Sequence, residues 1–149
     1  MTDYTWVVSA GGVITSGGTA TDNTVTITWT GAGSQTVSVN YKTSAGCVAV
    51  EPKVKNVYVN VAPTPILTGA ANVTQGQVIT YQTAYTPGNG YTWNASHGNP
   101  EICFPNHNCL TLTWDFPCGV IAKGYVTVTE TNLTTGCSTT ATMLISITP

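Results

Sequence analysis

The 149-residue chain contains no arginine, and charged residues make up only 7% of it. An average soluble domain carries roughly 25% charged residues. The four lysines are too few to form the basic surface of a nucleic-acid-binding protein. Residues that favour helices are scarce, and no apolar run reaches the ~18–20 residues needed to cross a bilayer. These absences disfavour a nucleic-acid partner, a helical fold and insertion into a membrane.

The residues that are abundant favour strands. Threonine (29 residues) and valine (17 residues) together make up about 31% of the chain, and both are β-branched. Hydrophobic residues reach 42%, which is too many for a disordered chain. Apolar and polar residues alternate with a period of two, as in strands that are half buried. The alternating segments cover residues 25–29, 37–41, 57–61, 110–114, 126–128 and 143–147. Glycine-rich turns separate them, so we expect an all-β sandwich.

Four short motifs occur twice, in the same order and 85 to 90 residues apart. They are Tyr-Thr-Trp at residues 4–6 and 91–93, Thr-Ile/Leu-Thr-Trp at 26–29 and 111–114, Val-Ser/Thr-Val at 37–39 and 126–128, and Gly-Cys at 46–47 and 136–137. Ordered recurrence of this kind indicates a duplicated domain. The tryptophans fall at repeated places on alternating strands, which predicts a core position between two sheets for Trp6, Trp29, Trp93 and Trp114.

A short proline-containing segment separates the two copies. Pro63 and Pro65 lie two residues apart, a spacing that is unsuited to a central strand and typical of a stiff linker. We therefore predict two domains, residues 1–62 and residues 63–149. The first copy has no counterpart of roughly residues 63–88, which would be its first two strands. We expect the chain to begin inside a domain and the first unit to have an open face or edge.

Four of the five cysteines fall in the last 47 residues: Cys103, Cys109, Cys118 and Cys137. One interpretation is a metal site that includes His107, although the spacing matches no familiar zinc pattern. The favoured interpretation is a loop closed by a disulfide, as in proteins of oxidising compartments. The bridge would join two of Cys103, Cys109 and Cys118, and Cys137 would pair with the third or stay free.

The chain offers little for catalysis. His97 and His107 are its only histidines, both in loop-like stretches, and no nucleophile elbow is present. Residues 63–149 contain only three acids, Glu101, Asp115 and Glu130, and no obvious carboxylate pair. We expect a protein that is not an enzyme and that has no metal or other cofactor.

The motif order, together with Gly-Gly-Val-Ile-Thr-Ser-Gly at residues 11–17, resembles the PKD-like repeats of large secreted surface proteins of Bacteroidota, such as gliding-motility adhesins. The resemblance implies tandem immunoglobulin-like sandwiches that are exported by type IX secretion and displayed on the cell surface. The sequence departs from the family at residues 72–76, where many repeats carry a cysteine that could bridge to the Gly-Cys position. That bridge cannot form here.

These features predict a structural or adhesive repeat of an extracellular protein. Its partners would be neighbouring repeats of the same polypeptide or of another copy. One alternative is a carbohydrate-binding module, in which exposed aromatic rings would contact a surface polysaccharide; Tyr41, Tyr58 and Tyr85 are the candidates for such contacts. Another alternative is a fibre subunit whose first unit is completed by a strand from a neighbour.

Overall fold

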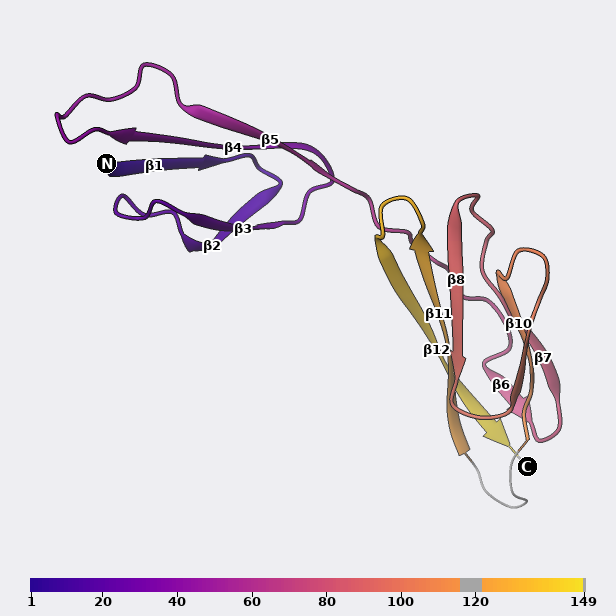
Figure 1. Ribbon diagram of the computed structural model, residues 1–149. Coiled ribbons are helices and arrows are strands. Elements are labelled where there is room, and N and C mark those ends of the chain that lie inside the picture. Colours follow the sequence, from indigo (N-terminus) through magenta and orange to yellow (C-terminus); the bar gives the residue numbers. More distant parts are fainter. Residues whose placement is uncertain (116–121, 149) are drawn as a thin grey trace. The chain divides into compact units, whose positions relative to one another are not determined.

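The computed structural model describes residues 1–115 and 122–148, and this part of the chain is all-β (Figure 1). It contains no helix, and thus no helix that could cross a membrane. The all-β prediction is confirmed. Contacts divide the chain into two units, Met1–Val61 (unit 1) and Ala62–Pro149 (unit 2). Pro63 and Pro65 lie outside the strands.

Unit 1 contains five strands in two antiparallel sheets. The strands are β1 (Thr2–Val8), β2 (Gly12–Gly17), β3 (Val25–Trp29), β4 (Gly33–Lys42) and β5 (Lys53–Val59). One sheet has the order β1-β4-β5, and β2 pairs with β3 in the other. Burial alternates along β3, so that Val25, Ile27 and Trp29 lie on the more protected face and the threonines between them are exposed. This is the period-two pattern that the sequence predicts.

The described residues of unit 2, 62–115 and 122–148, form seven strands in two sheets. They are β6 (Asn72–Thr74), β7 (Val78–Gln82), β8 (Asn89–Ala95), β9 (Asn99–Ile102), β10 (Cys109–Thr113), β11 (Ala122–Asn132) and β12 (Ser138–Thr148). The sheets have the orders β7-β10-β9 and β6-β12-β11-β8. All pairings are antiparallel except the parallel pair of β6 and β12. Figure 1 shows the sheet of β8, β11 and β12 facing the strands β7 and β10.

A single hydrophobic core joins the two sheets of unit 2. Its buried members come from β6, β7, β10, β11 and β12 and from Trp114, which directly follows β10. Trp114 and Leu112 are completely inaccessible to solvent. Trp93, on β8, is partly buried and packs against this cluster. Apolar side chains on the inner faces of two facing sheets are what makes a β-sandwich stable. The core members are Val73, Tyr81, Leu110, Leu112, Trp114, Val126, Ile145 and Ile147.

Unit 1 has no comparable core. All of residues 1–61 are described, and none of their side chains is fully buried. The inward-facing residues of β3, β4 and β5 are only half buried, as in Trp29, Val39 and Val57. A half-buried apolar side chain keeps part of its surface in water and contributes correspondingly less to stability.

The strand pairing of unit 1 has the same plan as part of unit 2. Trp6 of β1 lies opposite Val39 of β4, and Trp93 of β8 lies opposite Val128 of β11. The register of β4 with β5 is equivalent to that of β11 with β12. Gly33 lies opposite Val59 in the first pair, and Ala122 lies opposite Ile147 in the second. The hairpin of β2 and β3 likewise parallels that of β9 and β10. The pairings without a counterpart in residues 1–61 are those of β6 and β7.

Candidate functional site

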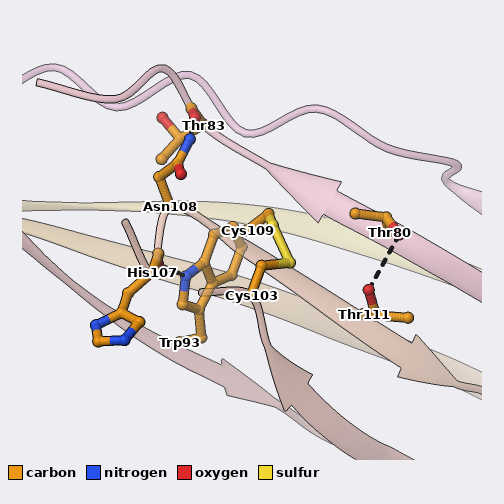
Figure 2. The surroundings of a disulfide bond; sticks show 8 residues. All are labelled: Thr80, Thr83, Trp93, Cys103, His107, Asn108, Cys109 and Thr111. Atoms are coloured by element: carbon orange, nitrogen blue, oxygen red, sulfur yellow. Dashed lines mark hydrogen bonds between the residues drawn. A yellow bond between two sulfur atoms is a disulfide. The ribbon is translucent and has the colours of Figure 1, made fainter. Parts of the chain in front are cut away.

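A short loop closed by a disulfide connects β9 to β10 (Figure 2). Cys103 and Cys109 form the bridge, with their Cα atoms 5.3 Å apart, which confirms the predicted disulfide. Their sulfurs are joined, so they are not the thiolate ligands that a zinc site would require. Cys118 lies outside the described residues. Cys47 and Cys137 form no disulfide with any described cysteine.

Backbone hydrogen bonds hold the loop in a tight turn. The amide of Cys103 donates to the carbonyl of Cys109 at 3.1 Å, and the amide of His107 donates to the carbonyl of Cys103 at 3.0 Å. The Trp93 indole N–H donates to the His107 carbonyl at 2.8 Å, so β8 of the opposite sheet also anchors the loop (Figure 2). The loop is therefore fixed at three points, by the disulfide, by its own turn and by Trp93.

The end of the loop is tied to β7 by Asn108. Its side-chain amide donates to the carbonyl of Thr83 at 2.8 Å, and the Thr83 amide donates back to the Asn108 carbonyl at 3.0 Å. These two bonds extend the ladder of β7 and β10 by one step beyond the strand ends. The buried Thr83 hydroxyl has no hydrogen-bond partner among the described residues.

The outer side of the loop presents an aromatic pair to solvent. The Phe104 side chain is 83% exposed, and its ring meets the His107 ring edge-on with the centroids 4.7 Å apart. In Figure 2 the His107 imidazole points away from the disulfide. A large apolar side chain on a fixed, exposed loop can contact a partner at a low cost in conformational entropy.

A shallow groove lies beside this loop, between β8 and the hairpin of β9 and β10. Apolar side chains dominate its lining, which consists of Trp93, Asn94, Ala95, Pro100, Ile102 and Leu110. No carboxylate, histidine or thiol contributes to it. Over residues 1–115 and 122–148, no three His, Cys, Asp or Glu side chains come together as metal ligands. The groove can offer shape and apolar contact, but it carries no group that transfers protons or attacks a substrate.

The four tryptophans occupy two kinds of environment. Trp114 is fully buried, and its indole N–H donates to the Tyr81 hydroxyl at 3.1 Å. The Trp6 indole N–H donates to the Asp22 carbonyl at 3.0 Å, much as Trp93 donates to the loop carbonyl in unit 2. Trp6, Trp29 and Trp93 are half buried. Of the predicted exposed tyrosines, Tyr58 and Tyr85 are exposed, whereas Tyr41 packs on Tyr4 with ring centroids 5.9 Å apart.

Tyr81 connects the core of unit 2 to its edge. Its hydroxyl donates to the Ala70 carbonyl at 2.9 Å and accepts the Trp114 indole, and its ring lies edge-on to the Trp114 ring with centroids 6.3 Å apart. Its ring packs on Gly69, where a Cβ atom would come within 2.3 Å of it. Burial raises the pKa of the Tyr81 phenol, and the hydrogen bond from Trp114 partly opposes that rise.

Glu130, one of the three acids of residues 63–149, is a buried carboxylate. It is 4% exposed and accepts hydrogen bonds from the Asn89 amide at 2.7 Å and the Tyr91 hydroxyl at 3.4 Å. A signal for this burial exists in the sequence. Glu130 continues the alternation of Val126 and Val128, and all three side chains are buried. The Tyr91 hydroxyl also accepts a hydrogen bond from the Thr86 amide and donates one to the Ala84 carbonyl. The Glu130 carboxylate therefore belongs to a hydrogen-bond network that fixes the turn before β8.

The sequence matches no protein-family model and no curated protein. The likeness to PKD-like repeats therefore rests on the motifs of the chain itself. The site has no catalytic constellation in the described residues. It consists of a fixed loop with an exposed aromatic ring beside an apolar groove.

Proposed function

We propose that this chain is a pair of tandem PKD-like, immunoglobulin-like repeats from an extracellular surface adhesin or filament, and that its role is structural and adhesive. The observation that carries the proposal is the shared pairing register of the two units. Trp6 of β1 lies opposite Val39 of β4, and Trp93 of β8 lies opposite Val128 of β11. The two strand pairs therefore align equivalent residues. A one-residue slip of register would turn every side chain to the other face, so agreement in three pairings favours duplication over coincidence.

Two details outside the ladders support duplication. The indoles of Trp6 and Trp93 both donate to a carbonyl in the loop of the hairpin that follows, between β2 and β3 in unit 1 and between β9 and β10 in unit 2. The turns that end in Gly-Cys also agree. The Thr43 amide donates to the Cys47 carbonyl at 2.9 Å, and the Asn132 amide donates to the Cys137 carbonyl at the same distance. Each turn contains a glycine in the left-handed region, with φ values of 79° at position 46 and 74° at position 136.

The chemistry of the described residues supports a role in structure. Long antiparallel ladders join strands through many backbone hydrogen bonds, and β11 pairs with β12 over ten residue pairs. The disulfide is typical of proteins that fold in an oxidising compartment, which fits export to the cell surface. Low charge and exposed threonines suit a surface that faces water without a specific reaction.

Mechanical unfolding of the full chain between two handles tests this proposal. Unit 2 should unfold in one step that releases up to about 300 Å of chain, because its 88 residues each extend by about 3.6 Å. Unit 1 should yield at a lower force, since it lacks a buried core. Gradual extension of unit 2 without a discrete step would contradict a structural role.

A carbohydrate-binding module is the second candidate, and the exposed ring of Phe104 favours it. Aromatic faces stack on sugar rings, and this one lies beside the groove bordered by Trp93 and Ile102. A glycan array distinguishes the two candidates. Sugar binding that is lost in Phe104→Ala and kept in the control Leu144→Ala, which also removes an exposed apolar side chain, would favour the module. No binding to any glycan would favour the structural repeat.

A further inference from the structure

Two strands of unit 1, β3 and β5, lack on one side the partner strand that their counterparts in unit 2 have. Strand β3 pairs only with β2, and β5 pairs only with β4, in a unit whose residues 1–61 are all described. In unit 2 the strands at the matching places have partners on both sides, because β7 pairs with β10 and β6 pairs with β12. Backbone N–H and C=O groups along such edges are a template for another strand.

The side chains along these edges are also less covered than their counterparts. Ile145 and Ile147 of β12 are each 1% exposed, whereas Val57 and Val59 of β5 are half buried. Unit 2 shows what provides the cover. Val73 of β6 lies opposite Ile147 and is itself buried in the core. In unit 1, an apolar residue on a short strand beside β5 would bury Val57 and Val59 in the same way.

The indole of Trp29 gives a third, independent indication. In unit 2 the Trp114 indole donates to the hydroxyl of Tyr81, which lies on β7. Trp29 ends β3 as Trp114 follows β10, but no described residue accepts a hydrogen bond from its indole. A strand with a tyrosine at the place of Tyr81 would supply that acceptor and cover the ring.

We propose that the β3 and β5 edges of unit 1 form a binding site for an extended peptide segment with the chemistry of β6 and β7. The occupant is uncharged and alternates apolar and polar residues. It places an apolar side chain opposite Ile27, as Ile79 lies opposite Leu112, and a tyrosine opposite Val25, as Tyr81 lies opposite Leu110. This inference rests on the proposed repeat relationship between the units.

The donor is a separate polypeptide segment and not β6 and β7 of a second copy of this chain. Val73 and Tyr81 are core residues of unit 2, and the Tyr81 hydroxyl holds both Ala70 and Trp114. A copy that released this segment would expose its own core and leave the buried Trp114 indole without an acceptor. That loss would offset what unit 1 gains.

The test adds a synthetic peptide of residues 66–83 to the full ¹⁵N-labelled chain and follows the amide and indole N–H signals by NMR. We expect shifts confined to β3, β5 and the Trp29 indole, together with slower solvent exchange of that indole. The same peptide with Tyr81→Phe should bind about 5- to 10-fold more weakly, because it lacks the hydroxyl acceptor. In the chain variant Trp29→Phe, the two peptides should bind equally well.

Three results would overturn this site. Absence of any shift at β3 and β5 would do so, as would shifts confined to β10 and β12, which would mean exchange with unit 2. Self-association of the chain without peptide, with protection of the Trp29 indole, would identify a second copy as the occupant. If the free chain keeps the β4–β5 ladder in these experiments, the repeat relationship survives a failed titration. If it lacks that ladder, the proposed function fails as well.

Discussion

Trp29 in unit 1 and Trp114 in unit 2 both follow a Thr-x-Thr pattern, the first as the last residue of β3 and the second directly after β10, but their environments differ. Trp114 is completely buried and its indole has an acceptor, whereas Trp29 is half buried and has none among the described residues. The difference comes from β6 and β7, which unit 2 has in addition. The comparison teaches that alternation within a strand determines which side chains face inward, while burial depends on strands that are distant in sequence.

The largest expected difference between the units concerns these tryptophans. Trp114→Ala should lower the free energy of unfolding of unit 2 by about 3–5 kcal/mol, because it leaves a cavity and removes one of the two hydrogen bonds of the Tyr81 hydroxyl. Trp29→Ala should cost unit 1 only about 1–2 kcal/mol, since part of its ring already contacts water. Denaturant titrations read from the indole signals of Trp6 and Trp93 report each unit separately.

The exposed Tyr58 of unit 1 provides the control for this comparison. Tyr58→Ala should change stability by less than about 0.5 kcal/mol, because the side chain is 70% exposed. Equal losses for Trp29→Ala and Trp114→Ala would mean that unit 1 buries its tryptophan as fully as unit 2 does.

Removal of the disulfide should weaken unit 2 alone. The double variant Cys103→Ser/Cys109→Ser should lose about 2 kcal/mol, as expected for opening a loop with a sequence separation of six residues. Thermal unfolding with unit-specific NMR probes measures the loss. Cys47→Ser should leave both units unchanged because that side chain is exposed and forms no disulfide with a described cysteine. A loss in unit 1 would show that the units unfold together.

Tyr81→Phe should cost unit 2 about 1 kcal/mol at neutral pH, through the loss of its hydrogen bonds to Ala70 and Trp114. The pH dependence gives a second measurement. The pKa of Tyr81 is raised in the folded state, so its contribution is complete below the unfolded pKa of about 10 and is lost as the pH rises through the folded value. The stability of unit 2 should therefore fall above about pH 10, and less steeply in Tyr81→Phe. Identical slopes would contradict this role.

The smallest expected change in stability comes from breaking the ion pair of unit 1. Lys42 and Asp3 lie 2.9 Å apart, and both side chains are about half exposed. Such pairs contribute roughly 0–1 kcal/mol and are screened by salt. Asp3→Asn should lower the stability of unit 1 by less than about 0.5 kcal/mol, and by less still in 1 M NaCl. A larger, salt-independent loss would show that Asp3 is structurally important for another reason.

Much of the strand pattern could be predicted from the sequence. The segment predicted at residues 25–29 is β3, and those at 37–41 and 110–114 largely overlap β4 and β10. Alternation reports on local conformation, so it predicts strands well. Strand β9 was not predicted, because Asn99–Ile102 is short, contains a proline and has no alternation. It is a strand because its edge pairs with β10.

The candidate site was predictable only in part. Cysteine spacing predicted a bridge among Cys103, Cys109 and Cys118 but could not choose the pair, since the choice depends on the β9–β10 hairpin. The bond from Trp93 to the His107 carbonyl joins the two sheets and has no local sequence signal. The burial of Glu130 could have been inferred from its place in the alternation of β11.

Hydrogen exchange of the full chain as a dilute monomer tests the central claim most directly. The claim is that both units share one strand plan and that only unit 2 is complete. Amides of β3 and β5 should exchange about 100-fold faster than those of β10 and β12, which corresponds to a difference of about 2.7 kcal/mol in local opening free energy. Equal protection of the two sets of strands would contradict an open face in unit 1.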